Sequence, residues 1–192
     1  MRKAFAGSLL AVIVVACSSL TTAGLRAVSS LDPVETDPAH LQAAIGVDNA
    51  FRLRTGDARL TISYRLDGTE VPVISEEFKL EITAATGSEG LQPDPGEAIF
   101  VARIAEADLS RARDTQARIK VLRQSKSGSG DVSINVSSGC LTKPLPEKVP
   151  LRTFVRSHQA GKFVQLTGIE NILDLLTEDQ VQKVRQDFPA CQ

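Results

Sequence analysis

Alternating hydrophobic and polar residues predict strands along much of the chain. The clearest alternation covers residues 60–66, and a second covers residues 78–84. Between them, Asp67-Gly68 is a dipeptide typical of hairpin turns. Because side chains of a strand point alternately to opposite faces, each segment predicts a strand with one buried face. Residues 132–136 alternate in the same way, after a Ser- and Gly-rich segment, residues 127–131, that we interpret as a turn.

Other hydrophobic segments predict further strands. Residues 99–104 are hydrophobic on both faces, which is typical of a central strand covered from two sides. Residues 41–47 predict a first strand, and residues 151–156 and 163–167 predict two late ones. The Gly and Pro residues of segment 86–96 predict a loop. Together these segments predict a mainly β protein.

Residues 106–126 contain two competing patterns. Leu109, Ala112, Gln116 and Ile119 fall on one face of a helix, whereas hydrophobic residues alternate with basic ones along 117–121, as in a strand. We favour a helix, because the segment is long and contains no Gly or Pro. Acidic residues at its start and basic residues at its end also suit the helix dipole.

A second, shorter helix is expected near the C-terminus. Thr177 and Gln180 have the spacing of a capping box. Val181, Val184 and Phe188 then fall on one helical face, and a proline follows directly.

We therefore predict a mainly β fold: an antiparallel sandwich or wrapped sheet of six to eight strands, with one crossing helix and a short C-terminal helix. The absence of Trp leaves no Cys…Trp…Cys core to support an immunoglobulin topology. We expect residues 39–192 to form a single domain, which is long enough for its own hydrophobic core.

The N-terminus has the order of a secretory signal peptide. Arg2 and Lys3 precede a short hydrophobic segment, Leu9–Ala16, which is followed by Cys17. The hydrophobic segment is far shorter than the ~20 residues that cross a bilayer. Cleavage by an ordinary signal peptidase after Ala23 is the alternative, and it would remove Cys17.

Val14-Val15-Ala16-Cys17 resembles the lipobox of bacterial lipoproteins. The resemblance implies that residues 1–16 are removed as a signal peptide and that Cys17 is acylated. It also implies a lipoprotein that faces the periplasm, with the outer membrane favoured over the inner one because Ser18 follows the cysteine. Several acyl chains would give a stable membrane anchor.

Residues 17–38 are expected to form the lipidated Cys17 and a flexible tether. Ser and Thr are frequent there, and Asp32-Pro33 and Asp37-Pro38 disfavour a helix. About twenty flexible residues have a typical reach near ~25 Å, so the tether would hold the domain close to the membrane.

Cysteine content points to an oxidising compartment. The chain has three cysteines, and acylation of Cys17 leaves Cys140 and Cys191 as a pair. We predict a disulfide between them, because two leftover cysteines usually bond in the periplasm. Two buried free thiols are the alternative.

Composition argues against two classes of partner. The net charge of −1 gives no electrostatic attraction to nucleic acid. One Tyr and no Trp offer little surface for stacking sugars. Residues 106–126 do contain six basic side chains. They could form a docking surface for an anionic envelope polymer, but we favour an ordinary solvated helix face.

No familiar catalytic or metal-binding pattern occurs in the chain. Ser-x-x-Lys and Gly-x-Ser-x-Gly are absent, and His158 beside Ser157 is best interpreted as a loop residue. Two His and the Cys pair predicted to form a disulfide match no zinc spacing. Carboxylate pairs occur at Glu76-Glu77, Glu106/Asp108 and Glu178-Asp179. We assign no catalytic residue, metal or cofactor.

These observations predict a non-catalytic lipoprotein of the bacterial envelope, an accessory or structural module that binds another envelope component. The alternative is an envelope hydrolase that uses a dispersed carboxylate pair, which would have to face each other across a cleft.

Overall fold

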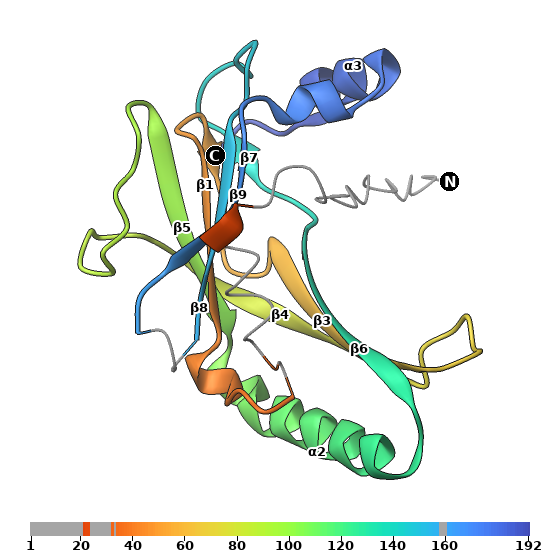
Figure 1. Ribbon diagram of the computed structural model, residues 1–192. Helices are drawn as coiled ribbons and strands as arrows, with labels where there is room; N and C mark the ends of the chain where they lie inside the picture. The colour runs from red at the N-terminus through yellow and green to blue at the C-terminus, as the bar shows by residue number, and fades with distance from the viewer. Residues whose placement is uncertain (1–20, 24–31, 33, 158–160) are drawn as a thin grey trace, which may run out of the picture.

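Seven strands form one curled antiparallel sheet, and two short strands form a second sheet beside it (Figure 1). The computed structural model describes residues 21–23, 32, 34–157 and 161–192. The large sheet has the order β6-β3-β4-β5-β1-β8-β9, and the small sheet pairs β2 with β7. The predicted mainly β, wrapped-sheet fold with two helices is confirmed.

The elements have the following bounds: η1 Pro38–His40, β1 Gln42–Asp48, β2 Phe51–Arg52, β3 Ala58–Leu66, β4 Ile74–Ala84, β5 Glu97–Ile104, η2 Glu106–Asp108, α2 Leu109–Ser125, β6 Gly128–Val136, β7 Cys140–Leu141, β8 Leu151–Arg156, β9 Val164–Ile169, η3 Ile172–Leu175 and α3 Glu178–Asp187. No helix among the described residues is both long and apolar enough to cross a membrane.

Alternation along β3 and β4 matches the way these strands bury one face. Leu60, Ile62 and Tyr64 are buried, and Leu60 pairs with the fully buried Phe78 on β4. Strand β5 lies between β4 and β1 and buries residues on both of its faces, as its hydrophobic sequence predicts. We call the face that carries Leu60 and Phe78 the inner face of the sheet, because the main hydrophobic core lies there.

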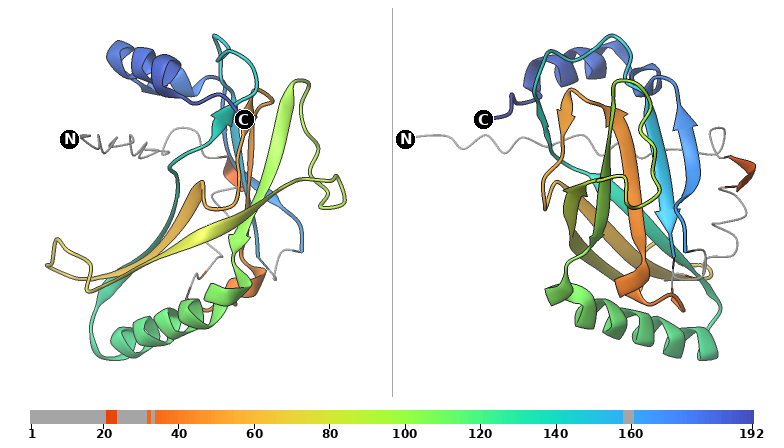
Figure 2. Two further views of the ribbon diagram at one scale, coloured as in Figure 1. Left: turned by 180° about the vertical axis from the view of Figure 1, so that it is seen from behind. Right: turned by 90° about the vertical axis from the view of Figure 1, so that its left-hand side faces the viewer.

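Helix α2 covers part of the inner face. Its buried residues are Ala112, Thr115, Gln116 and Ile119, which have the spacing of one helical face. Residues 117–121 belong to this helix, so the strand suggested by their alternation is not formed. Val121, which such a strand would bury, is 65 % exposed. The helix carries the chain from central β5 to the edge strand β6, and it lies along the part of the sheet formed by β3, β4 and β6 (Figures 1 and 2).

Strand β6 begins earlier than the sequence predicts. Residues 128–131, interpreted above as part of a turn, continue the pairing along β3 as far as Leu66. Glycine is required at the start of β6, because a Cβ on Gly128 would collide with the backbone carbonyl oxygen of Arg65 and would lie 2.9 Å from Cζ of Tyr64. Gly128, one of the glycines that suggested a turn, therefore leaves room for the β3 backbone and for the buried side chain of Tyr64.

On the outer face, a buried ion pair crosses the sheet between β5 and β8. Arg152 on β8 donates to both carboxylate oxygens of Glu97 on β5. The Glu97 side chain is only 6 % exposed. It reaches Arg152 across Gly46 of the intervening strand β1, which pairs with both neighbours. A Cβ on Gly46 would lie 2.8 Å from the carboxylate carbon of Glu97.

We therefore expect Gly46→Ala to destabilise the protein by about 1–3 kcal/mol, because the added methyl group would displace the Glu97 carboxylate. Equilibrium unfolding in denaturant measures the loss. The same substitution should cost much less in a Glu97→Ala background, where the carboxylate is absent. Equal costs in the two backgrounds would show that the collision with Glu97 is not the cause.

Candidate functional site

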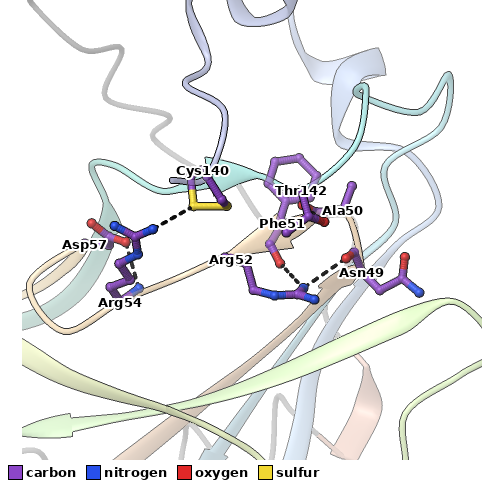
Figure 3. Close-up of a disulfide and its surroundings, with 9 residues drawn as sticks. Asn49, Ala50, Phe51, Arg52, Arg54, Asp57, Cys140 and Thr142 are labelled. Atoms are coloured by element: carbon purple, nitrogen blue, oxygen red, sulfur yellow. Dashed lines mark hydrogen bonds between the residues drawn. A yellow bond between two sulfur atoms is a disulfide. The ribbon is translucent and has the colours of Figure 1, made fainter.

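The disulfide joins the C-terminal end of the chain to the small sheet (Figure 3). The sulfur atoms of Cys140 and Cys191 are 2.05 Å apart. The pairing predicted from the cysteine count is therefore present. Cys140 lies on β7, which pairs with β2. In the chain-entropy model, a cross-link over 51 residues contributes about 4 kcal/mol to stability.

Two further contacts hold α3 to the same place. The ring of Phe188, directly after α3, meets Phe51 of β2 edge-to-face with 5.5 Å between centroids. The Cys191 N–H donates to the carbonyl of Leu141 over 2.8 Å. The capping box of Thr177 and Gln180 is present at the start of α3, as predicted. The disulfide thus fixes α3 beside the small sheet rather than on the large one.

A segment before the first strand packs along α2. We call residues 32 and 34–38 the strap. Val34 is 3 % exposed and belongs to the main core. The side-chain amide of Gln116 on α2 donates to the carbonyl of Thr36 over 2.7 Å. The sequence placed these residues in a flexible tether, whereas the described part of that segment from residue 32 onward is packed on the domain.

Three ion pairs connect the strap to α2. Asp32, Glu35 and Asp37 each accept from one basic side chain of the helix. The partners and distances are Arg123 at 3.0 Å, Lys120 at 2.8 Å and Arg113 at 3.0 Å, respectively. Residue numbers rise along the strap as they fall along the helix, so the strap runs antiparallel to α2.

Two further basic residues of α2 form ion pairs, with an acid on strand β4 and with one just before the helix. Arg111 and Arg118 both bind Glu76, at 3.3 and 3.2 Å, and Arg111 also binds Asp108. Five of the six basic side chains of residues 106–126 are therefore paired with acids of the same chain. This arrangement gives little support to a docking surface for an anionic polymer.

A groove of about 280 Å³ lies between the strap and α2. It is lined by two acids of the strap and by basic and polar residues of the helix: Glu35, Asp37, Pro38, Arg113, Gln116, Ala117 and Lys120. A glycosidase-type acid requires a carboxyl group with a raised pKa. The hydrogen bond from the Ala39 N–H, followed by the Arg113 guanidinium, instead lowers the pKa of Asp37. The groove is thus unsuited to general-acid catalysis by Asp37.

The other acidic pairs lie outside this groove. Glu76 and Glu77 are neighbours on β4, where Glu76 faces α2 and Glu77 pairs with Arg59 of β3. Glu178 and Asp179 lie in the first turn of α3. Among the described residues, no cluster of three or more His, Cys, Asp or Glu could hold a metal ion. The alternative of a carboxylate-based hydrolase therefore gains no supporting site from the described residues.

Buried polar groups give no sign of a missing ligand. Within the described part of the chain, every buried side-chain nitrogen or oxygen has a hydrogen-bond partner. Cys17 and His158, which the sequence singled out, lie outside the described residues. Sequence reasoning missed the strap, although its acids are complementary in sign to the basic helix.

Comparison with protein-family models, curated proteins and solved structures finds no match to this chain. Its function must therefore be argued from its own residues.

Val34 should contribute to stability through its burial between the sheet and α2. We expect Val34→Ala to lower the free energy of unfolding by about 1–3 kcal/mol, from lost apolar burial plus a small cavity. It should also speed amide hydrogen exchange along residues 34–41. Val121→Ala is the matched control, because this exposed valine lies on α2 itself, and its effect should stay within about 0.5 kcal/mol. Equal effects of the two substitutions would contradict the packing role of the strap.

Acid should weaken the attachment of the strap and so release it more often. Partial burial opposes ionisation of Asp32, but hydrogen bonds from Val34 N–H and Arg123 outweigh it and lower its pKa below the usual 3.8. The pKa of Asp37 is lowered as well. Because both values are depressed in the folded state, their stabilisation is complete above the usual carboxyl pKa and is lost as pH falls through the folded values. Each exposed pair contributes about 0.2–1 kcal/mol.

Hydrogen exchange of residues 34–41, corrected for its intrinsic pH dependence, measures this release. Protection should be constant near neutral pH and should fall below about pH 4. A chain with both Asp32→Asn and Asp37→Asn should show less protection at neutral pH and a weaker fall in acid. An unchanged acid profile in this variant would assign the release to other groups.

Proposed function

We propose that this chain is a lipid-anchored protein of the bacterial envelope, held by acylated Cys17 and facing the periplasm. Its β domain would be a non-catalytic module that binds another envelope component. The observation that carries the proposal is the pairing of Cys140 with Cys191. Disulfides persist in oxidising compartments and are rare in the cytosol. This leaves Cys17 without a second cysteine to pair with, and it directly follows the apolar segment Leu9–Ala16.

Thr21 supports an anchor close to the domain. Its N–H donates to the Leu166 carbonyl over 2.8 Å, and its hydroxyl donates to the Gln165 carbonyl over 2.7 Å. Both acceptors belong to the edge strand β9. Thr21 is four positions after Cys17, and four positions span at most about 14 Å. An acylated Cys17 would therefore hold the β9 edge near the membrane surface.

The non-catalytic role rests on how the charged side chains are used. The acids of the strap–α2 groove neutralise basic residues of the helix, and Glu97 neutralises Arg152 across the sheet. These groups serve to hold segments together. A domain of this kind suits recognition through its surface rather than chemistry in a cleft.

Cys17→Ser tests the anchor in cells that express the full chain. We expect the substitution to abolish incorporation of radiolabelled fatty acid and to move the protein from the membrane to the soluble fraction. Ser18→Ala is the matched control and should keep both properties, because it leaves the acylated residue in place. Acyl labelling of the Cys17→Ser chain would refute the lipobox interpretation.

The binding role is tested separately on the wild-type chain in its membrane. In-cell cross-linking should capture a defined envelope component through the β domain. Hydrolysis of cell-wall material by the purified full chain, with no captured component, would favour the hydrolase instead.

A further inference from the structure

The disulfide has a cationic side chain beside one of its two sulfur atoms. The guanidinium Nη2 of Arg54 lies 3.5 Å from Cys140 Sγ (Figure 3). The Asp57 carboxylate accepts from the main-chain N–H of Arg54 over 2.7 Å, and it also accepts from the Ser138 hydroxyl over 2.5 Å. Asp57 therefore links the segment that carries Arg54 to the segment that leads into Cys140. This link holds the main chain of Arg54 close to the Cys140 sulfur.

The two cysteines also differ in burial. Cys140 is only 6 % exposed, because β7 pairs with β2 and also meets Ala190 through Leu141. Cys191, which follows the C-terminal helix, is partly exposed. In thiol–disulfide exchange an external thiolate attacks one sulfur while the other leaves as a thiolate. The structure thus makes Cys191 the more accessible target and places the positive charge beside the sulfur that would leave.

We propose that a dithiol partner exchanges this disulfide, with attack at Cys191 and departure of Cys140. The partner's thiolate forms a new S–S bond to Cys191 Sγ. The bond between Cys140 and Cys191 breaks, and its electron pair stays on Cys140 Sγ beside Arg54. A neighbouring Arg stabilises a thiolate, and a stabilised thiolate leaves faster.

A second step completes the reduction. The partner's other thiolate attacks the partner's own sulfur in the mixed disulfide, and Cys191 leaves as a thiolate. The chain has then gained two electrons, and the dithiol has been oxidised to a disulfide.

Reduction at this site would free the C-terminal helix. The α3 residues whose burial is described are all partly or fully exposed, so the helix has little burial of its own to hold it. Besides the disulfide, its attachments include the ring contact between Phe51 and Phe188, the hydrogen bond from Arg185 to the Leu145 carbonyl, and the main-chain bonds of Leu141. The main core contains no residue of α3. Reduction therefore uncouples α3 from the small sheet while the large sheet keeps its own core.

Arg54→Gln tests the role of the charge, and Arg52→Gln is the matched control. Both arginines are exposed, but the Arg52 guanidinium donates to the carbonyls of Asn49 and Phe51 (Figure 3). With excess dithiothreitol under native conditions, Arg54→Gln should slow reduction about 2- to 10-fold, and Arg52→Gln should keep the wild-type rate. Arg54→Lys retains the charge and should retain most of the rate. Equal rates for the two glutamine variants would overturn the role of Arg54.

A monothiol, 2-mercaptoethanol, identifies the attacked sulfur because it leaves a mixed disulfide. After an acid quench and alkylation of free thiols, peptide mass spectrometry of the full chain should find the adduct on Cys191 and the alkyl label on Cys140. The opposite placement would overturn the direction of attack. A rate that does not rise with thiol concentration would overturn exchange in the folded state, because unfolding would then limit it. Peptide mapping separates both cysteines from Cys17, so the result does not depend on acylation.

Amide hydrogen exchange of the oxidised and reduced chains tests the release of α3. In the reduced chain, residues 178–188 should lose nearly all protection, whereas residues 58–66 of β3 should remain protected. Equal protection of α3 in the two forms, or loss along β3 in step with α3, would overturn the release. None of these measurements depends on which envelope component the domain binds.

Discussion

The inner face of the curled sheet must be kept from water, and the packing of α2 against it is the contact on which the rest of the domain depends. The helix contributes small and medium side chains, Ala112 and Ile119 among them, where it meets the sheet. Arg111 also lies over the ring of Phe78, 4.1 Å from its centroid. Val34 of the strap completes the same core. Covering one hydrophobic face thus brings together residues from the start, middle and later parts of the chain.

This arrangement gives the charges of α2 a structural role. A helix with many basic residues could attract anionic partners if its charges were unpaired. Here, Asp32, Glu35 and Asp37 lie along the helix and neutralise three of its basic side chains. The energy of each exposed pair is small, so the burial of Val34 and the hydrogen bond from Gln116 also contribute to the attachment. The ion pairs fix the direction in which the strap crosses the helix.

Sequence patterns predicted those elements whose evidence is local. The alternation of β3 and β4, the capping box at Thr177 and the helical spacing from Ala112 to Ile119 all depend on residues close in the chain. The strap was missed because its partners on α2 lie about eighty to ninety residues away and cannot be identified from composition. The start of β6 was missed for a related reason: glycine is required at residue 128 by the close approach of Arg65 and Tyr64, which belong to another strand.

The two edges of the sheet face different physical requirements. Strand β9 is approached by the N-terminal part of the chain, and Thr21 occupies two of its carbonyls. Strand β6 is at the far end of the strand order, and its inner-face valines and isoleucine are only partly covered. An exposed, regular and nearly uncharged edge promotes aggregation unless it has a defined use. Val132, Ile134 and Val136 alternate with polar residues along β6, so this edge keeps an apolar side that its pairing with β3 covers only in part.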